Sequence, residues 1–198
     1  SRKHGVPVRW AETRSENTMA TIHGRGQIQH IELAADDDGK LTAIRVRLIG
    51  DMGAYLQLVT PGIPILGAFL YAGVYDLPKA YDFSCTSVLT TMTPTDAYRG
   101  AGRPEATYAI ERAMDALAAK IGIDPLELRR RNFIPTEAYP YEAFSGLTYD
   151  SGDHDAAATM AADMIGYDEL RARQATQNVP GAATRIGIGV SSYFEMCG

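Results

Sequence analysis

Two arginines, Arg99 and Arg103, flank a Gly-Ala-Gly tripeptide in the stretch TPTDAYRGAGRPEATYAIERAMD, which spans residues 93–115. Pro104 follows directly, and proline is common in the first turn of a helix. The free N–H groups at the start of a helix carry a partial positive charge that favours an anion. Glycines let the backbone approach a ligand closely, and guanidinium groups add fixed charge and several donors. The stretch therefore predicts a loop that could hold a phosphate or an oxo-anion at the start of a helix.

A purely structural interpretation of the same stretch stays open from these residues alone. The glycines could serve only to form a tight turn, because short glycine-rich loops are common. The arginines could pair with Asp96, Glu105 or Asp115. Glu105 would also compete with an incoming anion, because it lies in the first turn of the predicted helix.

No metal site is predicted from the remaining residues that could ligate one. The four histidines are scattered, and none has metal-ligand spacing with another histidine, a cysteine or a carboxylate. The two cysteines, Cys85 and Cys197, form no CxxC pair and cannot make a disulfide framework. Three consecutive arginines at positions 129–131 are explained by a solvated helix C-terminus, where the helix dipole favours positive charge.

Composition and charge indicate a globular protein of the cytoplasm. The 198 residues are 45% hydrophobic and 22% charged, which provides for a sizeable core. The net charge of −5 argues against a nucleic-acid partner, since such proteins are usually basic. The longest apolar run, residues 62–74, is shorter than the roughly 20 residues that span a bilayer. No apolar signal sequence opens the chain, so we expect a cytoplasmic location with no membrane span.

The elements that must position the loop begin with a β-hairpin over residues 26–55. Two alternating runs surround Asp38-Gly39, which predicts a two-residue turn with Asp37 facing Lys40. The register that follows places Leu33 opposite Ile44, Ile31 opposite Val46 and Glu32 opposite Arg45. A slip by one residue would mix the apolar and polar faces, so the pattern fixes this register.

The rest of the chain predicts an α+β fold in which the antiparallel hairpin packs with several helices. Residues 60–79 indicate a buried irregular segment or short helix, and residues 81–92 a third strand. Helical spacing predicts a helix over 105–121, stopped at Gly122, and Asp124 caps a short helix that runs to Asn132. Residues 134–153 are expected to be a loop, followed by two helical segments from Asp153 to about residue 177, and residues 185–197 resemble a strand.

Several stretches together resemble the large subunits of molybdenum hydroxylases, the family of the carbon monoxide dehydrogenase large chain, aldehyde oxidase and xanthine dehydrogenase. The strongest is DAYRGAGRPEATYAIERAMDALAAKIGIDPLELRRRNFIP. VPVRWAETRSENTMATIHGRGQ and DGKLTAIRVRLIGDMGAY precede it, and YPYEAFSGLTYDSGD and GIGVSSYFE follow, in the order that the family shows. The resemblance covers nearly the whole chain and implies an internal part of a larger subunit. Residues 1–178 would belong to the first molybdopterin-binding domain, and residues 179–198 would form a linker or strand leading into the second.

The resemblance also implies a cofactor, partners and roles for the loop. Arg99 and Gly100 would contact a molybdenum–molybdopterin cofactor, and Ala101 and Gly102 would form part of the wall of the substrate pocket. Electrons would leave through 2Fe-2S clusters and FAD, on an iron–sulfur small subunit and an FAD-binding medium subunit. The catalytic glutamate and most pterin contacts of the family lie beyond Gly198. These 198 residues alone would therefore contain no catalytic residue, bind no cofactor and be inactive.

Departures from the family narrow the chemistry that the resemblance implies. The carbon monoxide-oxidising type has Cys-Ser-Phe after the motif arginine, whereas this chain has Gly100, Ala101 and Gly102, so no thiol is available for copper. The purine-oxidising type has a phenylalanine where Ala101 stands, and a substrate-binding arginine near Leu66. The chain is closer to the form II group, which hydroxylates aldehydes or N-heteroaromatics using water. Two alternatives stay open, a carbon monoxide dehydrogenase large chain and a non-catalytic module that binds an anion or a protein.

Overall fold

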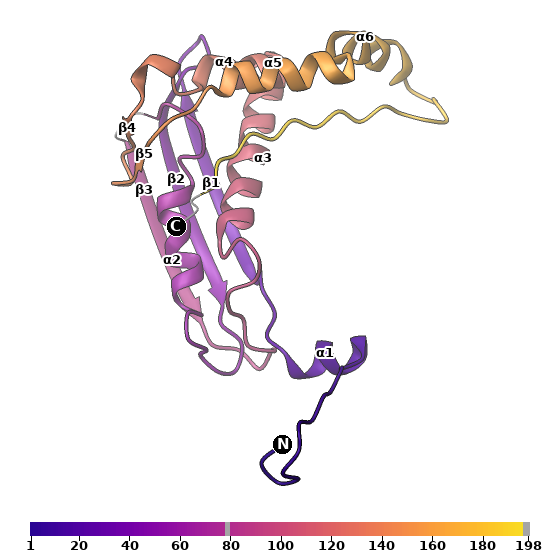
Figure 1. The fold of residues 1–198 in the computed structure, drawn as a ribbon. Coiled ribbons are helices and arrows are strands. Elements are labelled where there is room, and N and C mark those ends of the chain that lie inside the picture. Colours follow the sequence, from indigo (N-terminus) through magenta and orange to yellow (C-terminus); the bar gives the residue numbers. More distant parts are fainter. Residues whose placement is uncertain (78–79, 196–198) are drawn as a thin grey trace.

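A three-stranded sheet forms one layer of the molecule, in a computed structural model that describes residues 1–77 and 80–195 (Figure 1). Strands β1 (Gln27–Ala35) and β2 (Leu41–Asp51) are antiparallel neighbours, and β3 (Tyr81–Val88) lies parallel to β2 on its other side. The strand order is β1-β2-β3, so β2 is central. The predicted hairpin and third strand are therefore confirmed, and the third strand ends four residues before Met92.

The hairpin has the predicted register over most of its length. Leu33 lies opposite Ile44 and Glu32 lies opposite Arg45. Arg45 joins the strands at the surface, because its guanidinium lies 3.5 Å from Glu32 and 3.1 Å from Asp82 of β3. The alternation explains this register, since a shift by one residue would turn the apolar face of β2 towards solvent.

The turn of the hairpin differs from the prediction of a two-residue turn with Asp37 facing Lys40. The register shifts between Ala34 and Ala35, and the Asp36 N–H donates to the Lys40 carbonyl at 3.0 Å. The Asp36 carboxylate also accepts from the N–H groups of Asp38 and Lys40, at 3.1 and 2.8 Å. An aspartate that accepts from the backbone two residues ahead stabilises its own turn. For this reason the loop covers residues 36–40 and is longer than two residues, so the predicted two-residue turn was wrong.

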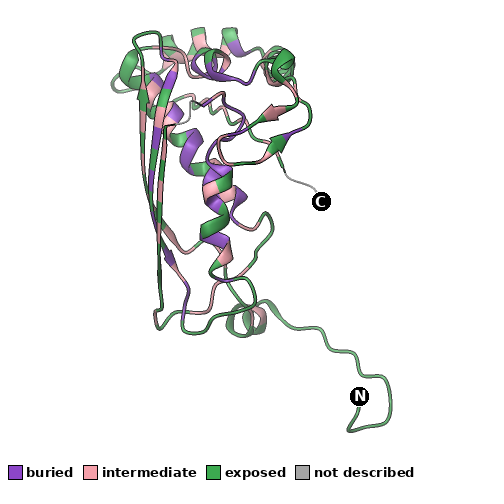
Figure 2. Cartoon of the chain, turned by 90° about the vertical axis from the view of Figure 1, so that its left-hand side faces the viewer, coloured by how far each residue is buried: buried purple, intermediate pink, exposed green. Residues whose placement is uncertain are grey.

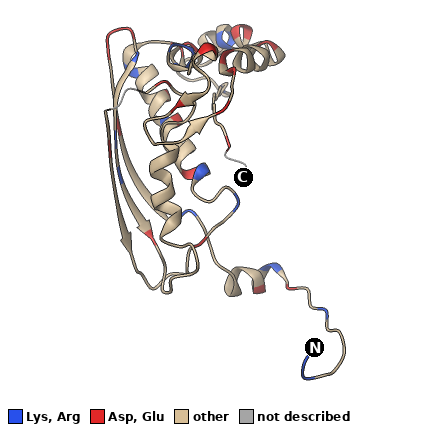
Figure 3. Cartoon of the chain, turned by 60° about the vertical axis from the view of Figure 1, so that its left-hand side comes forward, with Lys and Arg blue, Asp and Glu red and all other residues tan. Residues whose placement is uncertain are grey.

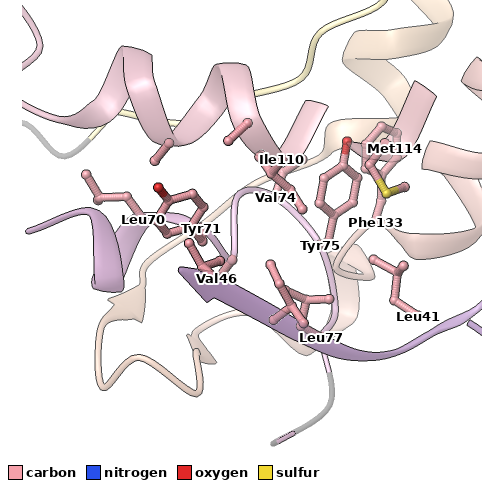
Figure 4. Packing of buried hydrophobic residues seen from close by; sticks show 14 of the residues in the cluster. Leu41, Val46, Leu70, Tyr71, Val74, Tyr75, Leu77, Ile110, Met114 and Phe133 are labelled. Carbon is pink, nitrogen blue, oxygen red and sulfur yellow. The ribbon is translucent and has the colours of Figure 1, made fainter. Parts of the chain in front are cut away.

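The core lies between one face of the sheet and the helices α2 (Gly62–Leu70) and α3 (Arg103–Ile121). Alternate residues of β2 are buried, among them Val46, while Ile110 and Met114 project from α3 at helical spacing. Figure 4 shows Val46 facing Ile110 and Val74, with Tyr75 beside Met114. Figure 2 shows the helices on one side of the sheet only. Residues 60–79, predicted as a buried irregular segment or short helix, contain the short helix α2; positions 78 and 79 lie outside the described residues.

The second half of the chain caps one end of this two-layer unit. Helix α4 (Pro125–Asn132) begins at the predicted cap, where Asp124 accepts from the N–H groups of Leu126 and Glu127. Helices α5 (His154–Ile165) and α6 (Tyr167–Gln177) follow as predicted, and Asp153 caps α5. The segment predicted as a loop contains the 3-10 helix η1 (Thr136–Ala138) and the short antiparallel strands β4 (Tyr141–Glu142) and β5 (Thr148–Tyr149). The α+β class is thus confirmed.

Residues 185–195 do not form the predicted strand in the part of the chain that the structure describes; positions 196 and 197 lie outside it. They run extended past α3 as a strap, drawn in yellow in Figure 1. The side chain of Asn178 both donates to the Ile186 carbonyl, at 2.9 Å, and accepts from its N–H, at 2.8 Å. Further on, the Ser192 N–H donates to the Glu111 carboxylate at 2.9 Å. Side chains hold this segment, so no ladder of backbone hydrogen bonds is required.

The N-terminal residues form an exposed arm that ends in the short helix α1 (Arg14–Ala20). Thr13 and Glu16 form a capping box there.

Basic and acidic segments alternate over the described residues in Figure 3, without a continuous basic band. No helix in the described ranges is both long and apolar enough to cross a membrane.

Candidate functional site

The loop that carries Arg99 is anchored to the end of β2 before it reaches α3. The Thr95 hydroxyl donates to the Asp51 carbonyl at 2.7 Å, and the Thr60 hydroxyl donates to the Thr95 carbonyl at 2.6 Å. Gly53 allows the approach, because a Cβ there would lie 2.4 Å from the Thr93 carbonyl oxygen. The start of the loop is therefore fixed by the sheet, and its end by α3.

Three successive residues of the loop have left-handed backbone angles. The φ angles are +94° at Gly100, +42° at Ala101 and +99° at Gly102. A Cβ on Gly100 would lie 2.6 Å from Pro104 Cδ, and one on Gly102 would lie 2.7 Å from the Ile63 carbonyl oxygen. Glycine is thus required twice, once for the turn and once for contact with α2. Ala101 adopts an angle that L-residues rarely use, so the surrounding contacts must hold it there.

Arg99 projects from this turn as an exposed side chain. Within the described residues its guanidinium forms no ion pair, and Asp115 is bound instead by Arg112 and Arg129, at 2.8 and 2.9 Å. The interpretation that acidic neighbours neutralise Arg99 is therefore wrong in the described part of the chain. The charge of Arg99 is available to a ligand, which keeps its predicted role open.

Arg103 is placed quite differently from Arg99, although the two arginines flank the same tripeptide. Its side chain is only 4% exposed, and Nη1 donates to the Leu70 carbonyl at 3.3 Å. The guanidinium carbon lies 4.2 Å from the centre of the Phe194 ring. Burial lowers the pKa of Arg103, which the nearby Glu195 carboxylate partly offsets, and no hydrogen-bond partner for Nε or Nη2 lies among the residues described. Arg103 thus holds the start of α3 against α2 and the strap.

The start of α3 offers fewer free donors than the sequence suggests. The Ala101 N–H donates to the Tyr98 carbonyl at 2.7 Å, and the Arg103 N–H donates to the Gly100 carbonyl at 2.9 Å. Pro104 has no N–H to offer. Attraction of an anion at this loop therefore depends on the Arg99 side chain more than on the helix end. Contact of Arg99 and Gly100 with a cofactor stays a prediction.

A groove of about 660 Å³ runs beside the loop, between β1 and α3. Arg25, Pro104 and Glu105 line its end near the loop. The rest is lined by Gln27, Gln29 and Ile31 of β1 and by positions 108, 109, 112, 113 and 116 of α3, three of which are alanines. Ala101 and Gly102 do not line it: Gly102 is buried and Ala101 is half-buried. The role of these two residues in a substrate pocket accordingly stays a prediction.

Sequence reasoning missed two features around the site. The first is Arg25, whose guanidinium reaches the Arg99 carbonyl across 74 positions of sequence. Only the two glycines beside it, in HGRGQ, could have drawn attention to it. The second is Arg129, which was expected on a solvated helix end but is fully buried, with Nε 2.8 Å from the Glu111 carboxylate. That prediction was wrong for Arg129, because burial against Glu111 and Asp115 satisfies its charge.

Comparison with known proteins identifies the family of the chain. Residues 1–133 match the molybdopterin cofactor-binding domain. The carbon monoxide dehydrogenase large chain of Hydrogenophaga pseudoflava is 39% identical over 98% of this chain and 24% of its own length. The nicotine 6-hydroxylase large subunit of Paenarthrobacter nicotinovorans is 32% identical over 98% of this chain and 23% of its own length.

Solved structures give the same picture for the fold. Quinoline 2-oxidoreductase from Pseudomonas putida 86 superposes with a TM-score of 0.78 and 34% identity, over 88% of this chain and 22% of that chain. Reconstituted CO dehydrogenase from Oligotropha carboxidovorans superposes with a TM-score of 0.77 and 37% identity, over the same shares. The chain spans about a quarter of the length of the curated relatives that it matches. The sequence match and the shared α+β architecture show that the chain belongs to the molybdopterin cofactor-binding domain family.

Proposed function

We propose that this chain is part of the molybdenum-cofactor-binding large subunit of an oxidoreductase that hydroxylates an aldehyde or an N-heteroaromatic compound using water. One observation supports this above the others: in a molybdopterin cofactor-binding domain, a loop with three left-handed residues presents the exposed Arg99, whose charge has no ion-pair partner among the residues described. FAD and 2Fe-2S clusters on partner subunits would carry the electrons away. Residues 1–178 would form part of the first molybdopterin-binding domain, with 179–198 leading into the second.

The residues present fit a molybdopterin cofactor. Its phosphate and oxo groups are anionic, and the exposed Arg99 guanidinium provides a fixed charge with several donors. Gly100 is required in the turn that presents this side chain, because a Cβ there would lie 2.6 Å from Pro104 Cδ. When bound, the cofactor would supply the oxidation of the substrate carbon. Arg99 would orient the anionic group, and Ala101 and Gly102 would form adjoining wall of the pocket.

The residues after Arg99 and two of the named relatives support hydroxylation. Positions 100–102 contain no cysteine that could hold copper. Two relatives are named for nicotine and quinoline, which are both N-heteroaromatic compounds.

We also propose a cytoplasmic location, in line with the low cysteine content. Carbon monoxide-dependent dye reduction by the intact complex tests the alternative of a carbon monoxide dehydrogenase, for which we expect no activity.

The experiment that tests the role of Arg99 compares Arg99→Ala with Arg99→Lys in the intact subunit. We expect Arg99→Ala to lower turnover at least about tenfold, because a lost charge-assisted contact is worth roughly 1.5–3 kcal/mol. Arg99→Lys should recover only part, since it lacks the planar fork. Arg173→Ala, an exposed arginine of α6, is the matched control. Wild-type molybdenum content and turnover in Arg99→Ala would contradict the proposal.

A further inference from the structure

The turn formed by Gly24, Arg25 and Gly26 lies directly against the loop that carries Arg99. The His23 N–H donates to the Pro94 carbonyl and the His23 carbonyl accepts from the Asp96 N–H, each at 2.9 Å. A Cβ on Gly24 would lie 2.7 Å from the Cβ of Tyr98. Glycine at this position therefore lets the two backbones touch. The contact joins segments that are more than 70 positions apart in the sequence.

Arg25 makes two contacts with the loop from this turn. Its Nη2 donates to the Arg99 carbonyl at 2.6 Å, and its guanidinium carbon lies 4.7 Å from the centre of the Tyr98 ring. Both are typical guanidinium interactions, a charge-assisted hydrogen bond and a cation–π contact. Arg25 forms no ion pair with any residue in the described ranges. Its polar contact is thus directed at the peptide unit that joins Arg99 to Gly100.

The position of this contact matters because the residues that follow are strained. Ala101 has a φ of +42°, and Arg25 itself has a φ of +67°, which is unusual for a residue other than glycine. Such conformations persist only where several contacts determine them. Pro104 and Ile63 fix the loop from the side of α3 and α2. Arg25 fixes it from the opposite end, at the peptide before the first left-handed residue.

We propose that Arg25 is a positioning residue: it clamps the Arg99 carbonyl and thereby sets the direction in which the Arg99 side chain projects. The meaning of that direction for catalysis rests on the proposed function, whereas the clamp itself does not. Arg25 would act through Arg99 and would touch neither substrate nor cofactor.

Amide hydrogen exchange of the intact, cofactor-free subunit tests the clamp without any activity assay. The N–H groups of Ala101 and Arg103 are bonded within the turn, so their exchange reports opening of the loop. We expect Arg25→Gln to speed their exchange about tenfold, as follows from the loss of a hydrogen bond from a charged group. Arg25→Lys should give a smaller increase, because it keeps the charge and loses the fork. Arg112→Gln, which changes another exposed arginine at the same groove, should leave the exchange unchanged.

The outcomes separate the clamp from a general structural role. Unchanged exchange at Ala101 and Arg103 in Arg25→Gln would overturn the proposal. So would an equal acceleration at Ile110 in the middle of α3, because it would indicate global destabilisation. In the loaded enzyme we expect Arg25→Gln to keep its molybdenum and lose kcat several-fold, with little change in KM. If Arg99→Ala leaves turnover unchanged while Arg25→Gln opens the loop, the clamp stands and the proposed function fails.

Discussion

Removal of the Arg129 guanidinium should strongly destabilise this chain. Arg129 has no exposed surface, and its Nε and Nη2 bind the carboxylates of Glu111 and Asp115 at 2.8 and 2.9 Å. Its Nη1 and Nη2 also donate to the carbonyls of Pro125 and Glu111, at 2.9 and 3.1 Å. The group therefore joins α3 to α4 at several points.

The magnitude follows from what Arg129→Met leaves behind. Removal of one member of a buried ion pair costs about 3–5 kcal/mol, because the other charge stays buried. The Glu111 carboxylate keeps two donors, the Tyr75 hydroxyl and the Ser192 N–H, and Asp115 keeps Arg112. The lower end of the range, about 3 kcal/mol, is therefore expected. Glu111→Gln in the same background should recover part of the loss, since it removes the uncompensated charge.

Urea denaturation of the 198-residue chain, followed by circular dichroism, measures these free energies of unfolding. Arg130→Met is the matched control, because Arg130 pairs with Asp155 at the surface (Nε–Oδ1 3.0 Å) and should cost below about 1 kcal/mol. A loss under about 1 kcal/mol for Arg129→Met would refute the reasoning. A double variant no more stable than the single one would show that the buried charge of Glu111 is not the cause.

Two further predictions concern the loop and the pH dependence of stability. Gly53→Ala should lower the free energy of unfolding by at least about 2 kcal/mol in the same assay, because the φ of Gly53 is +68° and a Cβ there would meet a backbone oxygen. The control Gly62→Ala, at a helical position with open space, should be neutral or slightly stabilising. Equal effects of the two variants would contradict the steric argument. Burial lowers the pKa of His154 from 6.5, so the folded state favours the neutral ring. The contribution of His154 to stability should therefore be fully present above pH 6.5 and be lost as the pH falls through the lowered pKa. His154→Gln should reduce that slope and His30→Gln, on a surface strand, should keep it; a wild-type slope in His154→Gln would count against this cause.

Local patterns predicted most of the elements, because each carried its own signal. The alternation in the hairpin fixed the register opposite Arg45, and Asp124 with Pro125 marked the start of α4. The predicted two-residue turn failed because the Asp36 carboxylate competes for the same backbone N–H groups. The prediction of a strand over residues 185–197 was wrong over the described part, 185–195. β-branched and alternating residues suit any extended segment, including one held by side chains.

The loop ahead of α3 was located from the sequence, whereas the roles of its residues at a cofactor stay predictions. Glycine and arginine types marked the loop at 99–103, but spacing along the chain could not distinguish the exposed Arg99 from the buried Arg103. That difference depends on Leu70 and Phe194, which are distant in sequence. The clamp by Arg25 was missed because a single arginine between two glycines resembles an ordinary surface turn. Long-range contacts of this kind need coordinates.

The strap imposes an order on the folding of this chain. Its hydrogen bond from Ser192 to Glu111 closes a loop of 81 positions, whereas the hairpin closes a turn of a few residues. Loop closure over 81 residues costs about 4 kcal/mol of chain entropy. The contacts of the strap offset that cost only once Glu111 is already in place. During synthesis the hairpin and α3 leave the ribosome first, so they can assemble while the strap is still unmade. The carboxylate of Glu111 is therefore in place early, and its hydrogen bond with the Ser192 N–H forms at a later stage of folding.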